Sequence, residues 1–414
     1  MSDLGIWLYD TLVGHLSSPR TDRLRFEPSE RALSKWGEGS TMLSLALPLS
    51  NEVRPPSDHL RAFFNGLLPE GAARDELTRR FNLRPRDILG LLRELGEDCA
   101  GAVVALPSGQ TPESRTGGYQ ELSDRDLSEL ILNLASAPLG NAPDHVTRKS
   151  LAGVQPKLLL TKTPVGRWAQ PTNGAPSTHI LKPEEHNYPG GASNEAWCMR
   201  LARSCGLTTV DADVFTVDDT PVFVVSRYDR VRAQGLTTRV HQEDSCQALA
   251  IETFDPRAKY GSHNTKRMTL RAIAELLRFH APSERSRLLA HTVFHIAIGN
   301  ADAHGKNHSI MHRPDGAVEL ASMYDAWSTI QYPQLSRTLS MSVDKSFQLD
   351  AIDRSRLVAE GTSWGLPLAT ALSVVEGTLE SLRQALADPA LRDGVFIADA
   401  FDENLCERVD DLMG

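Results

Sequence analysis

The last third of the chain carries apolar residues at helical spacing. From residue 269 onward, apolar positions recur three and four residues apart, which predicts a series of amphipathic helices. The expected helices cover residues 270–279, 284–298, 351–360, 369–387 and 404–412. This part of the chain therefore predicts a helical region.

The preceding part of the chain mixes short strand-like and short helical patterns. Period-two alternation or short buried runs predict strands at residues 5–10, 41–45, 158–160, 178–182 and 221–226. Helices are expected at residues 58–66, 87–95, 123–136 and 193–202. Residues 109–118 and 137–143 are rich in Gly, Pro, Ser and Asn, which predicts connecting segments. The fold class expected from this mixture is α+β.

Composition and charge narrow the class of protein. Hydrophobic residues make up 41% of the 414 positions and charged residues 23%, which is typical of a globular protein of two or three domains. No run of eighteen apolar residues occurs, and the N-terminus lacks a signal core, so we expect a cytoplasmic protein with no membrane partner. Five scattered cysteines form no disulfide or metal framework. The net charge of −9 argues against autonomous binding to nucleic acid.

Residues 299–309 (GNADAHGKNHS) form a polar loop after the apolar helix 284–298. Asp302 is followed five positions later by Asn307, the spacing of a phosphotransferase catalytic loop. There the carboxylate handles the proton of the acceptor hydroxyl, and the asparagine holds a magnesium ion. Two short strands around the turn 313–316 then lead to Asp325, in the place of the second metal ligand. Protein kinases arrange base, first ligand and second ligand in this order.

Two other interpretations of this region stay open. An Asp- and Asn-containing loop after a helix is commonly a turn held by side-chain to backbone hydrogen bonds. A zinc site is the other, because His291 and His295 share a helix face and His304 and His308 follow. No Glu stands beside His291 as the hydrolytic motif requires, and histidines inside an apolar helix are more typical of a core.

Three upstream segments could hold a nucleotide. Residues 150–157 (SLAGVQPK) could turn backbone N–H groups towards phosphates, although they hold one glycine and no Walker A motif. Lys182 ends an apolar strand and could reach the phosphates with Glu195 as its carboxylate partner. The strand expected at 221–226 leads into residues 226–228, whose backbone could hydrogen-bond to adenine. A solvated strand-end lysine and an ordinary core strand are the alternatives.

Several sequence blocks resemble the HipA family of serine/threonine kinase toxins from bacterial toxin–antitoxin pairs, and they follow one another in the same order as in that family. They are residues 64–71, 96–102, 150–157, 179–183, 227–230, 242–247, 302–307 and 324–325. The resemblance implies a two-lobed, protein-kinase-like fold with a strand-rich N-terminal region and lobe and an all-helical C-terminal lobe. The domains expected are an N-terminal subdomain (1–107), a linker and helix (108–147), a nucleotide-binding region (148–262) and a helical lobe with the catalytic loop (263–414).

The resemblance also implies roles for single residues. Asp302 would be the catalytic base, and Asn307 and Asp325 would bind Mg²⁺. Ser150 would be the autophosphorylated serine, whose modification ejects the loop that covers the nucleotide and switches the kinase off. The residues implied in ATP binding are Ala152, Gly153, Val154, Gln155, Lys157, Lys182, Ser226, Arg227, Tyr228, His304 and Lys306. Pro156 departs from the charged residue of many relatives and puts the mobility of the covering loop in doubt.

The partners follow from the resemblance alone. They are a helix-turn-helix antitoxin of the HipB type, operator DNA reached only through that antitoxin, and a protein substrate, expected to be an aminoacyl-tRNA synthetase whose phosphorylation arrests translation. Two other functions stay open. One is a small-molecule kinase on the same fold, and the other is a non-catalytic scaffold that binds the antitoxin and co-represses its operon.

Overall fold

The computed structural model describes residues 3–20, 23–114, 117–141, 148–233, 235–261 and 268–414. The chain divides into two compact units. The first contains residues 1–182, 229–256 and 311–317, and the second contains residues 183–228, 257–310 and 318–414. The domain boundaries expected after residues 147 and 262 lie at residues outside the described part of the chain.

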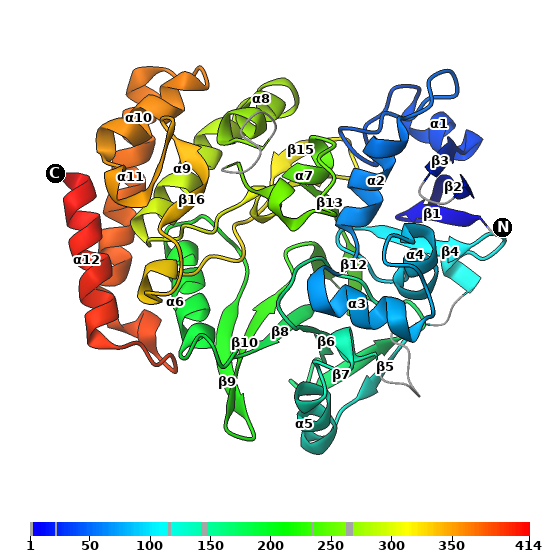
Figure 1. Cartoon of the computed structure of the whole chain (residues 1–414), viewed down its shortest axis with the longest axis horizontal. Coiled ribbons are helices and arrows are strands. Elements are labelled where there is room, and N and C mark those ends of the chain that lie inside the picture. The colour runs from blue at the N-terminus through cyan, green and yellow to red at the C-terminus, as the bar shows by residue number, and fades with distance from the viewer. Residues whose placement is uncertain (1–2, 21–22, 115–116, 142–147, 234, 262–267) are drawn as a thin grey trace. The chain divides into compact units, whose positions relative to one another are not determined.

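The first unit combines short helices with antiparallel strands (Figure 1). Its strands are β1 (Leu4–Leu8), β2 (Thr11–Arg20), β3 (Arg23–Pro28), β4 (Val103–Pro107), β5 (Gly118–Glu121), β6 (Leu158–Lys162), β7 (Trp168–Thr172), β8 (His179–Pro183), β11 (Arg230–Ala233), β12 (Leu236–Arg239) and β13 (His241–Asp244). Its α-helices are α1 (Glu30–Trp36), α2 (Ser57–Gly66), α3 (Gly71–Arg80), α4 (Ile88–Leu95), α5 (Asp124–Leu132) and α7 (Ser245–Ala248). Short 3₁₀ turns lie at Pro112–Ser114 and Pro138–Gly140.

Two antiparallel sheets organise this unit. One has the order β3-β2-β1-β4, and Leu4 faces Leu16 on one side and Pro107 on the other. In the other, β5, β7, β6 and β8 are neighbours in that order, and Leu158 faces Leu181. Helices α4 and α5 begin where the sequence predicts, because Asp87 caps α4 and Ser123 closes a capping box on α5.

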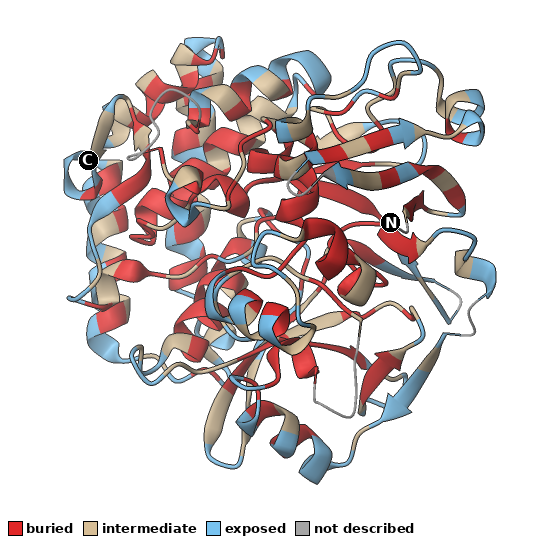
Figure 2. Ribbon diagram, turned by 45° about the vertical axis from the view of Figure 1, so that its right-hand side comes forward, coloured by how far each residue is buried: buried red, intermediate tan, exposed pale blue. Residues whose placement is uncertain are grey.

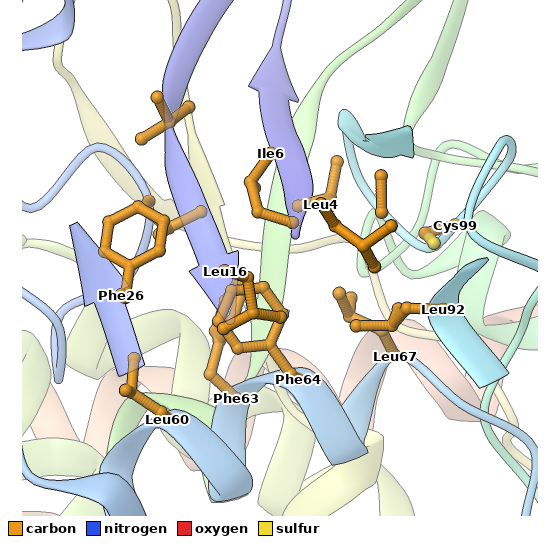
Figure 3. Close-up of a cluster of buried hydrophobic side chains, with 14 of the residues drawn as sticks. Leu4, Ile6, Leu16, Phe26, Leu60, Phe63, Phe64, Leu67, Leu92 and Cys99 are labelled. Carbon is orange, nitrogen blue, oxygen red and sulfur yellow. The ribbon is translucent and has the colours of Figure 1, made fainter. Parts of the chain in front are cut away.

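A hydrophobic core lies between the first sheet and helices α2 and α4 (Figure 3). Phe63 and Phe64 of α2 are fully buried, and their rings meet edge to face with centroids 5.1 Å apart. Leu4, Ile6 and Leu16 cover them from the sheet. Adjacent helix positions point in different directions, so two successive buried phenylalanines place α2 deep in the core.

Truncating Phe63 tests the importance of this core. We expect Phe63→Ala to lower the free energy of unfolding by about 3–5 kcal/mol, because a buried aromatic ring leaves a cavity that the sheet and helices fill only in part. Val53→Ala is the matched control, since that side chain is 69% exposed. Urea unfolding of both variants gives the difference. A loss below about 1 kcal/mol for Phe63→Ala would mean that the core is less tightly packed than described.

The second unit contains the longer helices. They are α6 (Gly191–Ser204), α8 (Leu270–His280), α9 (Glu284–Ala297), α10 (Arg354–Ser363), α11 (Leu368–Leu386) and α12 (Asp399–Met413). Its strands are β9 (Ala212–Val217), β10 (Thr220–Ser226), β14 (Ser309–His312, whose last two residues belong to the first unit), β15 (Val318–Leu320), β16 (Thr338–Val343) and β17 (Ser346–Gln348). Short 3₁₀ turns lie at Pro256–Lys259, Gly305–Asn307, Thr329–Gln331, Leu349–Ala351 and Pro389–Arg392.

Helix α11 is the centre of the helical part of this unit. It packs against α6, α9, α10 and α12 (Figure 1). Buried residues recur along α12 at Phe401, Leu405 and Val409, and exposed residues separate them (Figure 2). This is the amphipathic pattern from which the sequence predicts the helix. Within the described ranges, no helix is both long and apolar enough to cross a membrane.

The structure confirms the α+β class and corrects two expectations. The C-terminal region is not all-helical, because β14 to β17 lie within it. Residues 41–45 form no strand, and side chains satisfy their backbone groups instead. Leu43 O lies 2.8 Å from His241 Nε2, and Leu45 N–H donates to Glu243. A buried segment with its polar groups satisfied in this way needs no sheet partner.

Candidate active site

The loop with Asp302 begins where α9 ends. Gly299 adopts a left-handed φ of 70°, and a Cβ atom there would lie 2.5 Å from Ile330 Cδ1. The N–H of Asn300 donates to His295 O at 2.8 Å and closes the end of the helix. Only glycine fits this turn without a clash, so the sequence sends the chain sharply out of the helix at this position.

Two distant segments hold the loop in place. Thr329 Oγ1 donates to Gly299 O and accepts from the N–H of Ala301, both at 2.9 Å. From β16, the N–H of Ser340 donates to Ala301 O at 2.8 Å. Asp302 N–H donates to the Asn300 side chain at 2.9 Å. The backbone around Asp302 is thereby fixed on both sides, as a positioned catalytic group requires.

Asp302 is held partly protonated near neutral pH. Burial raises the pKa of this carboxyl to about 6; the positive charge of Lys259 opposes the rise, and the negative charge of Asp325 adds to it. Hydrogen bonds from Tyr260 and Ser340 also lower the pKa, which limits the shift. A carboxyl with a pKa close to the working pH is suited to exchanging a proton with an acceptor hydroxyl.

Asn307 and Asp325 meet directly. Asn307 Nδ2 donates to Asp325 Oδ2 at 2.8 Å. Asp325 adopts a left-handed φ of 57°, a conformation that Asp and Asn tolerate better than most residues. Asn307 is 5% exposed, and its buried Oδ1 atom has no hydrogen-bond partner among the residues that the structure describes. A buried acceptor without a donor is costly, which suggests that this oxygen has a ligand in the working protein.

The donor set around this contact fits magnesium. An amide oxygen and a carboxylate are the hard ligands that Mg²⁺ takes from a protein, with water and phosphate oxygens completing the shell. Asn307 Oδ1 and Asp325 are the residues that would hold the ion. The described residues contain no group of three or more His, Cys, Asp or Glu side chains placed to hold a metal.

The expected adenine segment lies near the metal residues. The rings of Tyr228 and Tyr324 stack with centroids 5.2 Å apart and planes at 27°. Tyr324 O–H donates to Lys306 O at 2.5 Å and lies 2.7 Å from Ser309 Oγ. This stack joins the segment after β10 to the residue preceding Asp325, so the aromatic pair and the expected metal ligands lie in the same part of the second unit.

The structure limits what Ser226 can contribute. Its N–H donates to Asp211 O, and its hydroxyl accepts from the N–H of Asp211, both at 2.9 Å. A backbone N–H contact to adenine from this segment would therefore come from Arg227 or Tyr228. Of the two expected loop residues, Lys306 is buried, and His304 is buried with its ring edge to face with Tyr260 at 5.3 Å.

The histidines of α9 are core residues. His291 and His295 are 2% and 3% exposed, and burial, as the leading cause, holds the pKa of both well below the ordinary value. His295 Nδ1 lies 3.1 Å from Asn300 Nδ2, and its ring meets that of His308 edge to face. Neutral, packed imidazoles of this kind support the loop rather than form the zinc site considered above.

In the first unit, Ser150 is completely buried. Its hydroxyl donates to Leu67 O at 2.6 Å, and its N–H donates to Asp98 O at 3.0 Å. The neighbouring Lys149 is also buried, and its ammonium donates to Leu159 O at 3.0 Å. Burial lowers the pKa of Lys149 to about 7, although the charge of Asp98 opposes this. A phosphate has no room at Ser150 in this arrangement.

The residues after Ser150 form a tight loop. Lys157 Nζ donates to Ala152 O at 2.9 Å, and a Cβ atom on Gly153 would lie 2.2 Å from that nitrogen. Gly153, with a φ of 118°, accepts the N–H of Glu70 at 3.3 Å. Val154 is 51% exposed, and Gln155 is half-buried. Lys157 therefore stabilises the loop from within, a role that its sequence position does not indicate.

The expected residues fall into two groups. Asp302, His304, Lys306, Asn307, Asp325 and residues 226–228 lie in the second unit, whereas Ser150, residues 152–157 and Lys182 lie in the first. Lys182 is buried near the end of β8, and Glu195 is buried in α6. The pairing of these two side chains stays a prediction. Sequence reasoning missed Lys259, Tyr260, Thr329 and Ser340, because each acts on Asp302 or its loop from a segment that carries no motif of its own.

Comparison with known proteins places the chain in a family. The model of the HipA N-terminal domain matches residues 4–106, and that of the HipA-like C-terminal domain matches residues 149–386. Y4mE of Sinorhizobium fredii is 34% identical over 93% of this chain and 92% of its own. The serine/threonine-protein kinase toxin HipA of Shewanella oneidensis is 28% identical over 92% of this chain and 89% of its own.

A solved structure agrees with these sequence matches. The HipA chain in a Shewanella oneidensis complex of HipA, HipB and operator DNA superimposes with a TM-score of 0.79 and 27% identity, over 99% of both chains. The matches cover the N-terminal part of the chain as well as the part with the Asp302 loop. The chain therefore belongs to the HipA family.

Proposed function

We propose that the protein is an ATP- and magnesium-dependent serine/threonine kinase that acts as the toxin of a toxin–antitoxin pair. The observation that supports this most strongly is the cluster of Asp302, Asn307 and Asp325 in one unit. Asn307 donates to Asp325 at 2.8 Å, and its buried Oδ1 atom has no partner within the described part of the chain, while the charge of Asp325 helps to raise the pKa of Asp302. A decayed, non-catalytic scaffold would have no reason to keep all three.

The chemistry proposed for these residues is positioning and charge neutralisation. Asp302 accepts the proton of the acceptor hydroxyl, and the fixed backbone on both sides of it keeps the carboxylate aimed. Asn307 Oδ1 and Asp325 hold magnesium, which when bound neutralises negative charge on the phosphates. Lys182 is the proposed phosphate contact in the first unit, and the backbone of Arg227 or Tyr228 meets adenine.

The raised pKa of Asp302 predicts an acid limit of the rate. We expect kcat/KM to fall below about pH 6, because the protonated carboxyl no longer accepts the hydroxyl proton. The sign follows from the role, since the ionised form is active and becomes scarce as the pH drops through the pKa. A rate profile between pH 5 and 8 measures it. A rate that stays constant across this range would contradict the assignment of Asp302 as the base.

Self-inactivation through Ser150 is part of the proposal. Because the hydroxyl of Ser150 is buried against Leu67 O, a phosphate on it would break that hydrogen bond and displace the loop 151–157. The added charge of roughly −1.5 to −2 would also repel nucleotide phosphates nearby. Phosphorylation thus favours a loop conformation different from the one described.

Replacing Ser150 tests this part of the proposal. We expect Ser150→Ala to lose label from radioactive ATP while remaining able to phosphorylate a protein substrate. Ser136→Ala is the matched control, because that serine is exposed and its hydroxyl donates to a neighbouring carbonyl, Asn133 O. Phosphosite mapping of both variants checks the result. Persistent labelling of Ser150→Ala would assign the modification to another residue, of which Thr147 is the nearest hydroxyl-bearing residue in the sequence and lies outside the described residues.

The proposed partners are a helix-turn-helix antitoxin of the HipB type and a protein substrate, an aminoacyl-tRNA synthetase. The first is supported by the complex of the Shewanella oneidensis relative with HipB and operator DNA. Phosphopeptide mapping of cells after brief expression tests the second. New phosphoserine sites absent from cells expressing Asp302→Asn would support a protein acceptor, and an unchanged set of sites would favour a small-molecule acceptor.

A further inference from the structure

A second pocket lies wholly within the first unit and shares no residue with the proposed active site. Its volume is about 430 Å³, within the range of small-molecule sites. The walls come from β5, the hairpin of β6 and β7 with the turn that follows it, and the β11–β12 ribbon. Apolar side chains, among them Val104, Ala175 and Leu236, form part of the lining.

Two arginines in this lining have unused hydrogen-bonding capacity. Arg232 is exposed and makes no hydrogen bond or ion pair with any residue that the structure describes. Arg239 binds Asp98 through Nε and Nη2 at 3.2 and 3.0 Å, and Gly174 O through Nη2 at 2.8 Å. Its Nη1 atom donates no hydrogen bond within the described residues. The pairing with Asp98 fixes the guanidinium and leaves one edge available to a ligand.

Polar groups of the pocket converge on the same place. Tyr119, on β5, is close enough to Arg232 and Arg239 for both cations to favour its ionised form, although burial raises its pKa overall. Thr237 also favours the ionised form of Tyr119, and the Tyr119 hydroxyl donates to Pro176 O at 3.4 Å. The polar groups of the lining are the Tyr119 phenol, the Thr237 hydroxyl and the two guanidinium groups, and they lie beside apolar side chains. This combination is suited to a ligand that joins an anionic group to an apolar group.

The negative charges near the pocket are already paired. Glu97 lies in the lining and forms an ion pair with Arg148 at 3.0 Å. Asp98, behind Arg239, also binds Arg230 at 2.9 Å and accepts two hydrogen bonds from Ser177. Arg232 pairs with no carboxylate in the described ranges. The pocket therefore has positive charge to spare for a ligand.

We propose that this pocket binds a small organic anion, a phosphate monoester or a carboxylate on a flat apolar body, with Arg232 and Arg239 holding the anionic group. The site is separate from nucleotide binding by the kinase and does not depend on that function being correct. Arg232 recruits the anion from solvent, and Arg239 supplies a fixed second donor.

The test is calorimetric titration of the full chain with phenyl phosphate, in the presence of magnesium and a saturating non-hydrolysable ATP analogue to keep the nucleotide site filled. We expect the wild type to bind, and Arg232→Gln to bind about tenfold more weakly, as the loss of one charge-assisted hydrogen bond predicts. Arg167→Gln should bind like the wild type. That exposed arginine lies near the same hairpin but pairs with Glu121 and is not in the lining.

Other probes separate the possible outcomes. Tighter binding of phenyl phosphate than of benzoate would identify a phosphate site, and the reverse would identify a carboxylate site. Equal binding of uncharged phenol would overturn the proposal, because the pocket would then be only an apolar hole. Absence of binding for both anions, or equal affinity of Arg232→Gln and the wild type, would overturn it as well. Arg232 is exposed, so its replacement leaves the fold intact and keeps the test decisive.

Discussion

Replacing Asp302 with asparagine is expected to reduce phosphate transfer by about a hundredfold to ten-thousandfold, the range of a lost general base. The amide keeps the size of the side chain but cannot accept a proton. Lys259, Tyr260 and the clamped loop remain in place, so substrate binding should change little. Steady-state kinetics should therefore show a fall in kcat with KM nearly constant.

The same substitution should stabilise the fold at neutral pH. A carboxyl whose folded pKa is raised from 3.8 to about 6 destabilises the folded state in its ionised form. This cost is absent below about pH 4, grows as the pH rises to 6, and is constant above it. We expect Asp302→Asn to raise the free energy of unfolding by roughly 3 kcal/mol at pH 7.5 and by almost nothing at pH 4.

Asp411→Asn is the control for both effects, because Asp411 is an exposed carboxylate on α12. It should change neither the rate nor the stability beyond about 0.5 kcal/mol. A fully active Asp302→Asn variant would contradict the role of Asp302 as the base. A variant less stable than the wild type at pH 7.5 would contradict the destabilising burial of its charge.

Asp325→Asn should abolish binding of magnesium nucleotide without unfolding the protein. Asparagine tolerates the left-handed backbone at φ 57°, and its oxygen can still accept the hydrogen bond from Asn307. The lost negative charge is what weakens the hold on a divalent cation. With ligand at a hundred times its Kd, the wild type should gain about 2.7 kcal/mol of stability, and the variant should lose most of this gain.

Thermal unfolding with and without magnesium and a non-hydrolysable ATP analogue measures this difference. Asp219→Asn is the matched control, since Asp219 also has a left-handed φ, of 64°, and is exposed in the turn between β9 and β10. Its magnesium-dependent rise in Tm should equal that of the wild type. An undiminished rise for Asp325→Asn would remove Asp325 from the metal site.

Much of the fold was predictable where the signal is local. Capping residues such as Ser123 and Asp87, and periodic apolar positions in α9 and α11, specify helices without reference to the rest of the chain. Residues 41–45 were misjudged because their alternation matches that of a strand. Their backbone partners are His241 and Glu243, about two hundred positions away. Strand β16 was overlooked because it is a short, serine-rich segment among helices.

The candidate site shows the same division. Asn307 and Asp325 could be brought together from sequence, because a short hairpin between two polar ends returns the chain to its starting point. The raised pKa of Asp302 could not be predicted from sequence, because it depends on Lys259, Tyr260 and Ser340 from other segments. The hydrogen bond from the N–H of Asp211 to the Ser226 hydroxyl is likewise a tertiary contact, and neither residue type predicts it.

The measurement that tests the central claim most directly is incubation of the purified chain with magnesium and γ-labelled ATP, wild type beside Asp302→Asn, followed by intact mass and phosphosite mapping. The account predicts one added phosphate on Ser150 of the wild type and none on the variant. Intact mass before incubation shows whether the wild type carries phosphate already. An unphosphorylated wild type that takes up no label, or equal labelling of both proteins, would contradict the account.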